Sequence, residues 1–221
     1  MRLALFDLDH TLIPFDSGMA WTRHLVRAGA LDAQAEQRYL DFCHQYVAGT
    51  LDIRAMVRAN LLPLAAFEPA QVQAWRESFE AEIAAQLPQA MRALVDEHRA
   101  QGDLCAIVTA TERLVAEPFA RAFGIEQLVC TEGERVAGRP TGEIAGLPCF
   151  REHKVTRVQQ WLADVQGVPD TIDGFERSFF YTDSINDLAL LEAVTDAVAV
   201  RADERLRRRA RAAGWLVLGG D

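Results

Sequence analysis

The chain has 221 residues, of which 50% are apolar and 25% are charged, a balance that is typical of a globular protein. Its length fits one large domain, or a core domain that carries an inserted subdomain. The net charge of −9 disfavours nucleic acid as the main partner, because a phosphate backbone is bound by clustered Lys and Arg. No apolar run approaches the ~20 residues that span a bilayer, so we expect no membrane segment.

The first motif and the cysteines bear on the compartment. The first candidate functional residue is Asp7, which leaves no room for a secretory signal before it. The four cysteines are far apart and form no CxxC pair, so neither a zinc site nor a redox dithiol is indicated. We therefore expect a cytoplasmic protein with reduced, buried thiols. The sequence leaves the oligomeric state open.

Short apolar runs alternate with helical stretches along most of the chain. We expect strands over 3–8, 103–110, 127–132, 178–183, 196–200 and 215–218. We expect helices near 88–101, 112–123, 152–165, 186–193 and 203–213. This alternation is typical of a parallel sheet covered by helices on both faces, so we predict a Rossmann-like, three-layer α/β core. The glycine-rich stretch 131–146 predicts a β-hairpin.

The stretch that follows the first predicted strand is different. Residues 17–86 contain almost no β-rich run, and their apolar residues have helical spacing. Breaks between the helices are expected near Gly29, Gly49, Pro63 and Pro69. We therefore predict an all-helical subdomain over 16–86, inserted into a core domain that consists of 1–15 and 87–221.

Polar side chains gather where the predicted strands end. In an open parallel sheet, ligands bind beyond the carboxyl ends of the strands. Six polar side chains are expected at such strand ends or at the helix starts that follow them: Asp7, Asp9, Thr109, Lys154, Asp183 and Asp187. The sequence therefore predicts four carboxylates, one hydroxyl and one ammonium at a single edge of the sheet.

This set of groups suits phosphoryl transfer. Clustered carboxylates raise each other's pKa, and Mg²⁺ offsets their repulsion while it also accepts phosphate oxygens and waters. The Thr109 hydroxyl can bind a phosphoryl oxygen, and Lys154 can neutralise its charge. An Asp carboxylate can attack phosphorus and form an aspartyl phosphate. Because residues i and i+2 of a strand point to the same side, we expect Asp9 beside Asp7, as acid and then base.

Four segments, in this order, resemble the motifs of the haloacid dehalogenase-like superfamily: DLDHT (7–11), the Thr of IVTAT (107–111), an isolated Lys (154) and TDSINDLALL (182–191). The resemblance covers nearly the whole chain. It implies that Asp7 is the nucleophile and Asp9 the general acid and base. The second Asp of the first motif belongs to the phosphatase branch, since the true dehalogenases lack it.

The resemblance also implies the ligands of the phosphate and the metal. The phosphoryl group would be held by Thr109, Ala110, Lys154 and Asn186. Mg²⁺ would be bound by Asp7, the backbone carbonyl of Asp9 and Asp183, with Asp187 orienting a metal-bound water. The helical insertion is similar to the four-helix type 1 cap of the phosphoserine phosphatase-like branch (subfamily IB). Such a cap expels water and protects the acyl phosphate.

The substrate is predicted to be a small phosphomonoester. Phosphoserine phosphatases have an acidic residue nine positions after the nucleophile, which contacts the substrate amine, and Asp16 stands there. Their cap arginine, which grips the substrate carboxylate, falls by spacing on Asn60, with Arg54 and Arg58 nearby. An amine contact without a carboxylate contact suits a phosphorylated amino alcohol such as histidinol phosphate. Phosphoserine and other small phosphomonoesters are the alternatives.

Other functions fit parts of the pattern. A phosphotransferase to an alcohol other than water would share Asp7 and Asp9. A phospho-relay receiver uses similar groups, but it is a compact fold of about 120 residues without a helical insertion, and its acidic pair is adjacent rather than spaced DxD. A catalytically silent binding protein would not need every one of these groups. Arg151 is the nearest competitor of Lys154 for the role of the cation.

Overall fold

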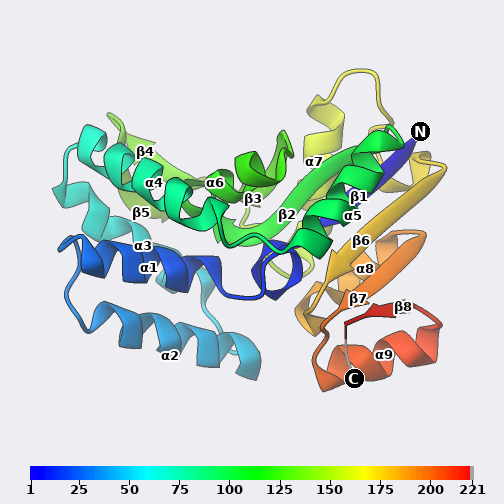
Figure 1. Cartoon of the computed structure of the whole chain (residues 1–221), viewed down its shortest axis with the longest axis horizontal. Helices are drawn as coiled ribbons and strands as arrows, with labels where there is room; N and C mark the ends of the chain where they lie inside the picture. The colour runs from blue at the N-terminus through cyan, green and yellow to red at the C-terminus, as the bar shows by residue number, and fades with distance from the viewer. Residues whose placement is uncertain (220–221) are drawn as a thin grey trace.

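The computed structural model describes residues 1–219, and its core is a six-stranded parallel sheet (Figure 1). The order of the strands is β3-β2-β1-β6-β7-β8, and every neighbouring pair is parallel. After β1, the chain adds β2 and β3 on one side of it and then β6, β7 and β8 on the other side. The direction in which strands are added therefore reverses between β1 and β6. Ligands of open parallel sheets bind at such a reversal point. The strands are β1 (Arg2–Phe6), β2 (Leu104–Glu112), β3 (Gln127–Thr131), β6 (Arg177–Thr182), β7 (Asp196–Val200) and β8 (Leu216–Leu218).

Helices cover both faces of this sheet. Successive strand residues point to opposite faces, so Phe6 and Leu5 enter two different apolar clusters. The Phe6 cluster packs against α5 (Gln89–Ala100) and α6 (Arg113–Phe123). The Leu5 cluster packs against α7 (His153–Asp164), α8 (Leu188–Ala193) and α9 (Glu204–Ala213), and short turns η3 (Ile172–Gly174) and η4 (Ile185–Asp187) flank β6. The predicted three-layer α/β core is confirmed.

The predicted helical insertion follows β1 and lies at the left of Figure 1. Its elements are α1 (Ser17–Arg27), α2 (Ala35–Ala48), α3 (Ile53–Leu61), the short turn η2 (Leu62–Ala66) and α4 (Pro69–Ala84). The predicted breaks are confirmed: Gly49 ends α2 in the left-handed conformation, with φ 77°, and Pro69 starts α4. Within residues 1–219, no helix is long and apolar enough to cross a membrane.

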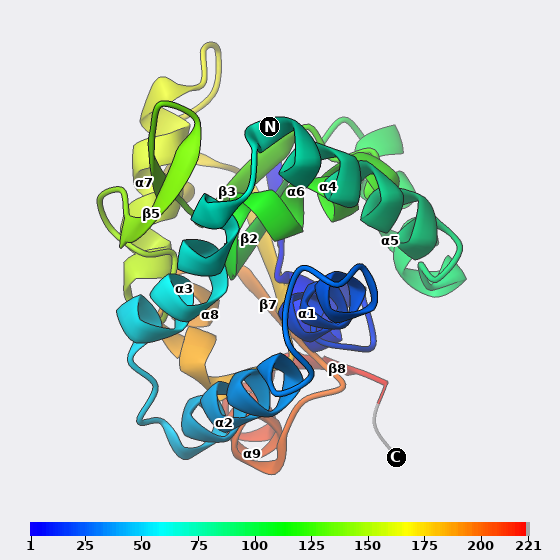
Figure 2. The same ribbon diagram turned by 90° about the vertical axis from the view of Figure 1, so that its left-hand side faces the viewer.

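The predicted hairpin is also present and lies against the insertion (Figure 2). Strands β4 (Gly133–Val136) and β5 (Arg139–Ile144) pair in antiparallel fashion. The hairpin packs on α3, where Ile144 forms a small apolar cluster with Val57 and Leu61. One end of the insertion is therefore supported by a part of the chain that follows β3.

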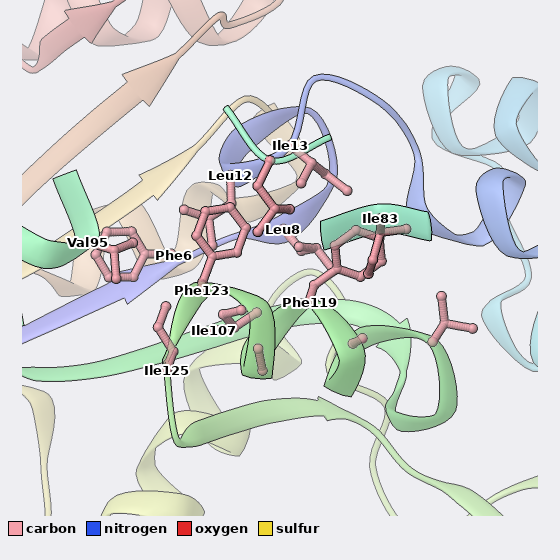
Figure 3. Packing of buried hydrophobic residues seen from close by; sticks show 14 of the residues in the cluster. Phe6, Leu8, Leu12, Ile13, Ile83, Val95, Ile107, Phe119, Phe123 and Ile125 are labelled. Carbon is pink, nitrogen blue, oxygen red and sulfur yellow. The ribbon is translucent and has the colours of Figure 1, made fainter. Parts of the chain in front are cut away.

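The insertion and the sheet share one apolar core. Figure 3 shows Leu8 beside Phe119 of α6 and Ile83 of α4, in one cluster that also contains Phe6 and Ile107. The rings of Phe79 and Phe119 meet edge to face, with their centroids 5.8 Å apart. Both side chains are almost fully buried. Because one continuous cluster joins the two parts, we expect them to unfold together.

We predict that Phe79→Ala lowers the free energy of unfolding by about 3–5 kcal/mol, because it leaves a cavity between α4 and α6. Denaturant unfolding followed by far-UV circular dichroism measures this change. The exposed Val136→Ala is the control, with an expected change within about 0.5 kcal/mol. A loss below about 1 kcal/mol for Phe79→Ala, or a separate early transition of the insertion, would contradict a shared core.

Candidate active site

Asp7 and Asp9 lie just beyond β1 rather than inside it. The strand ends at Phe6. The backbone N–H of Asp7, the next residue, still donates a hydrogen bond to the carbonyl oxygen of Tyr181 in β6, at 2.9 Å. The chain then turns through η1 (Leu8–Leu12), where His10 has a left-handed φ of 56°. Arg201 holds this turn, because its Nε donates to the carbonyl oxygen of His10 at 3.1 Å. Strand alternation therefore does not position Asp9, and that part of the sequence argument is wrong.

Two neighbouring segments hold the Asp9 carboxylate instead. Its Oδ1 accepts the backbone N–H of Ser17, the first residue of α1, at 2.6 Å. Its Oδ2 accepts the Thr111 hydroxyl at 2.8 Å. Asp9 is thereby tied to the start of the helical insertion and to the end of β2. Both bonds favour a fixed orientation of this carboxylate toward the cavity that Asp9 lines.

Lys154 is the cation at the centre of the site. Its Nζ donates to Asp7 Oδ1 at 2.9 Å and to Asp187 Oδ2 at 2.7 Å, and its side chain is only 3% exposed. Burial opposes the charge on Lys154, but the carboxylates of Asp187 and Asp7 outweigh it, so the pKa of Lys154 is raised. Arg151 is directed elsewhere, since its Nη2 donates to the carbonyl oxygen of Gly49.

The segment after β6 contributes two more carboxylates. Asp187 is buried and accepts the Thr182 hydroxyl at 2.7 Å in addition to Lys154. The backbone N–H of Asp183 donates to Thr11 Oγ1 at 3.0 Å, which ties this segment to η1. Burial, together with the nearby charge of Asp187, raises the pKa of Asp183 to about 6. The site thus brings an excess of carboxylates around a single lysine.

The pKa of Asp7 reflects the same excess. Burial raises it most, Lys154 lowers it, and the charges of Asp187, Asp183 and Asp9 raise it further. A hard cation offsets such repulsion, and the donors at hand are all oxygens. Among residues 1–219, no group of three or more His, Cys, Asp or Glu side chains is arranged to hold a metal ion. Two carboxylates and one backbone carbonyl nevertheless fit Mg²⁺, which usually keeps several waters.

The predicted phosphate ligands lie in the same cavity, which has a volume of about 650 Å³. Thr109 is buried, and its Oγ1 accepts the backbone N–H of Thr111 at 3.2 Å. Asn186 lies in η4, the turn into α8, where its backbone N–H donates to Ser184 Oγ. The structure brings together every predicted residue of the phosphate and metal sites along the wall of this cavity: Asp7, Asp9, Thr109, Ala110, Lys154, Asp183, Asn186 and Asp187.

Only one of the four predicted substrate-selecting residues lines this cavity. Asp16 precedes α1 and accepts the backbone N–H of Met19 at 2.7 Å and the Tyr39 hydroxyl at 2.9 Å. Burial and the charge of Asp9 raise the pKa of Asp16 to about 6. Asp16 is therefore a carboxylate in the cavity lining, with two donors on its Oδ1 and the Cys43 thiol 3.9 Å from its Oδ2.

The other three substrate-selecting predictions are not supported by this geometry. Arg54 is exposed, and Arg58 is exposed and paired with Glu143 of the hairpin. Asn60 donates through Nδ2 to Glu112 Oε1 at 3.2 Å. These three residues are absent from the described lining of the cavity. Helical spacing in the sequence does not reveal which face of α3 points toward the cavity. These three residues could therefore not be assigned correctly from the sequence.

Sequence reasoning missed Glu112 and the tyrosines of α2. Glu112 ends β2, lines the cavity and is only 4% exposed. The sequence predicts a strand that ends at 110 and a helix that starts near 112, so Glu112 was not named as a site residue, although it directly follows the Thr motif. Tyr46 lines the cavity as well, and its hydroxyl is 2.8 Å from Ser184 Oγ. This contact closes part of α2 onto the sheet edge.

Known proteins resemble this chain over nearly its whole length. A family model described as haloacid dehalogenase-like hydrolase matches residues 4–192. A protein from Neisseria meningitidis serogroup C (strain 8013) named histidinol-phosphatase is 37% identical over 220 residues, which are 98% of each chain. A Mycobacterium tuberculosis (strain ATCC 25618 / H37Rv) protein named phosphoserine phosphatase SerB1 is 30% identical, over 96% of this chain and 68% of its own length.

Solved structures agree with the fold. A protein of unknown function from Bordetella pertussis Tohama I superposes with a TM-score of 0.90 at 45% identity, over 99% of this chain and 98% of its own. A phosphoserine phosphatase with an analogue of its phospho-aspartyl intermediate superposes with a TM-score of 0.67 at 16% identity, over 98% and 92%. At that identity the likeness concerns the fold alone. With a family model that spans most of its length and relatives named as phosphatases, the chain belongs to the haloacid dehalogenase-like hydrolases and is a phosphatase of that family.

Proposed function

We propose that this phosphatase hydrolyses a small phosphomonoester through an aspartyl phosphate formed on Asp7, with Mg²⁺ as cofactor. The observation that carries the proposal is the buried Lys154, which binds Asp7 and Asp187 at the floor of a cavity that Asp9 also lines. Residues 16–86 act in it as a cap over the core formed by 1–15 and 87–221. A cytoplasmic location belongs to the proposal, and the four cysteines, all free, fit it.

In the first half-reaction, a carboxylate oxygen of Asp7 attacks phosphorus as the bond to the leaving alkoxide breaks. Asp9 gives its proton to this alkoxide. Lys154 keeps Asp7 oriented, and the Thr109 hydroxyl, the Ala110 backbone, Lys154 and Asn186 hold the phosphoryl oxygens. Mg²⁺, when held by Asp7, the Asp9 carbonyl and Asp183, supplies charge compensation for the phosphoryl group, with Asp187 orienting one of its waters.

In the second half-reaction, Asp9 acts as a base. It takes a proton from a water molecule as that water attacks phosphorus, and the bond between phosphorus and the Asp7 oxygen breaks. Inorganic phosphate leaves, and Asp7 returns to its carboxylate form. The bonds from Ser17 N–H and the Thr111 hydroxyl keep Asp9 in one place for both steps. Hydrolysis and transfer to another alcohol share these groups, so a phosphotransferase activity is the second candidate.

A phosphorylated amino alcohol fits the cavity best. Asp16 offers a carboxylate to a substrate amine. The arginine in the described lining, Arg205, belongs to α9 of the core. Among the described residues 16–86, no arginine lines the cavity, so the insertion lacks a charged fork for a substrate carboxylate. This argues against phosphoserine, and the relative named histidinol-phosphatase supports histidinol phosphate. A phospho-relay receiver is disfavoured, because such modules have no inserted helices.

Phosphate release with Mg²⁺ and with EDTA tests the proposal. The substrates are p-nitrophenyl phosphate, phosphoserine and histidinol phosphate. We expect metal-dependent hydrolysis of p-nitrophenyl phosphate and of histidinol phosphate, with the highest kcat/KM for histidinol phosphate. Phosphoserine should be a poor substrate or none. Product analysis with added alcohols distinguishes transfer from hydrolysis. Absence of metal-dependent release would overturn the phosphatase mechanism, and a strong preference for phosphoserine would overturn only the amino-alcohol assignment.

We predict that Asp7→Asn lowers steady turnover of p-nitrophenyl phosphate to below about one part in a thousand, because an amide is a poor nucleophile. Asp52→Asn is the matched control. Asp52 is exposed, caps α3 and lies outside the cavity lining, and Asn also caps helices. Its turnover should stay within twofold of the wild type. Turnover of Asp7→Asn above that limit, in protein with a native circular dichroism spectrum, would count against Asp7 as nucleophile.

We predict that Asp9→Asn slows catalysis by roughly 10²–10⁴, because both proton transfers lose their carrier. The first step should suffer less with p-nitrophenyl phosphate than with an alkyl phosphate, since p-nitrophenolate leaves without a proton. Rapid-quench measurement of the released alcohol gives the rate of this step for each substrate. An equal loss for both leaving groups would show that Asp9 is not the acid of the first step.

We predict that Asp16→Asn lowers kcat/KM for histidinol phosphate at least tenfold relative to p-nitrophenyl phosphate. The Asn side chain still caps α1 but offers no charge to an amine. In the wild type, the same selectivity should fall as the pH drops through about 6, because the Asp16 carboxyl then takes up a proton. An unchanged ratio of the two kcat/KM values would remove Asp16 from the substrate contacts.

A further inference from the structure

Glu112 is a buried carboxylate that no element of the fold requires. It is the last residue of β2 and directly precedes α6, where a side chain could cap the helix. Its side chain makes no such capping bond. Within residues 1–219, the one side chain that donates a hydrogen bond to it is Asn60, at 3.2 Å. The carboxylate therefore does not serve the helix that it precedes.

The surroundings of Glu112 are negative rather than positive. In the described part of the chain, no Lys, Arg or His lies within ion-pair distance of its carboxylate, whereas Asp16 and Asp9 are near enough to repel it. Burial and these two charges raise its pKa to about 7. Tyr39, whose hydroxyl donates to Asp16, is also close enough to Glu112 for the charge of this carboxylate to contribute to the raised pKa of Tyr39. A buried carboxylate without a cation is costly, and here it lines the substrate cavity.

We infer that Glu112 is a second substrate-selecting residue, whose carboxylate receives a nitrogen-bearing, proton-donating group at the end of the substrate away from the phosphate. This inference rests on the proposed phosphatase function. Asp16 and Glu112 then recognise two separate nitrogen groups, for example an ammonium and an imidazole N–H. Asn60 is a positioning residue, because its Nδ2 donates to Oε1 of Glu112.

This assignment also predicts that the cavity disfavours acidic substrates. Asn60, on which the spacing of the resembled family places a carboxylate-binding arginine, instead donates to Glu112, and Glu112 lines the cavity. A substrate carboxylate at this end would meet like charges from Asp16 and Glu112 in a water-poor space. Specific recognition often includes such a repulsive element. The site is thus built for a phosphate ester that is basic at its far end.

Three substrates that differ in their nitrogen groups test the inference. These are p-nitrophenyl phosphate with none, 2-aminoethyl phosphate with one, and histidinol phosphate with an amine and an imidazole. For Glu112→Gln we expect kcat/KM for histidinol phosphate to fall about tenfold to a hundredfold relative to 2-aminoethyl phosphate, the range for a lost bond to a charged group. Most of the change should appear in KM. Glu117→Gln is the control: Glu117 lies on α6, the helix that Glu112 precedes, but outside the cavity lining, so the ratio should stay within twofold.

Thermal stability gives a second readout that a structural role would not produce. Gln can still accept the bond from Asn60 but carries no buried charge, so we expect the Tm of Glu112→Gln at pH 8 to rise by about 2–4 °C. A lower Tm, or failure to fold, would mean that Glu112 is structural and would overturn the inference. So would an unchanged substrate ratio, or a wild type that does not favour histidinol phosphate over 2-aminoethyl phosphate. Failure of the phosphatase proposal is distinct, since none of the three substrates would then be hydrolysed.

Discussion

The site depends on the bond of one buried ammonium, Lys154, to two carboxylates. A charge in the interior is tolerated only when it is paired, and removal of one partner leaves an uncompensated charge. Lys154 begins α7, Asp7 follows β1, and Asp187 follows β6, so this pairing fixes three segments that are far apart in the chain. Within residues 1–219, the remaining carboxylates of the site accept hydrogen bonds but form no ion pair with a lysine or an arginine; these are Asp9, Asp16, Glu112 and Asp183. Their excess charge is what makes the site suited to a metal ion and a phosphate.

The fold brings these groups together because its strand order reverses beside β1. The loops after β1 and β6 therefore open into the same crevice, and the helical insertion covers it. The insertion is anchored by the apolar cluster that Phe79 and Phe119 join. It is also anchored in the site, where the first N–H of α1 binds Asp9. A movement of the insertion would therefore directly change the position of Asp9, the proposed acid and base.

Much of this arrangement could be predicted from the sequence. Continuous apolar runs identified all six strands of the sheet. The strand-end positions, together with the resemblance to the haloacid dehalogenase-like motifs, named the eight residues that line the cavity. The position of Asp9 could not be predicted, because the left-handed turn at His10 is held by Arg201 from the far end of the chain. The contact between Glu112 and Asn60 could not be predicted for the same reason. Their contact joins residues that are 52 positions apart, and periodicity gives no information on such pairs.

The most direct test of the account is to find the residue that carries the phosphoryl group. The enzyme is mixed with a ³²P-labelled phosphomonoester and Mg²⁺ and quenched in acid within milliseconds, and the labelled peptide is mapped by mass spectrometry. The account predicts a base-labile acyl phosphate on the peptide that contains Asp7. Label on any other residue, or rapid turnover in which no phosphorylated enzyme can be trapped at any quench time, would contradict it.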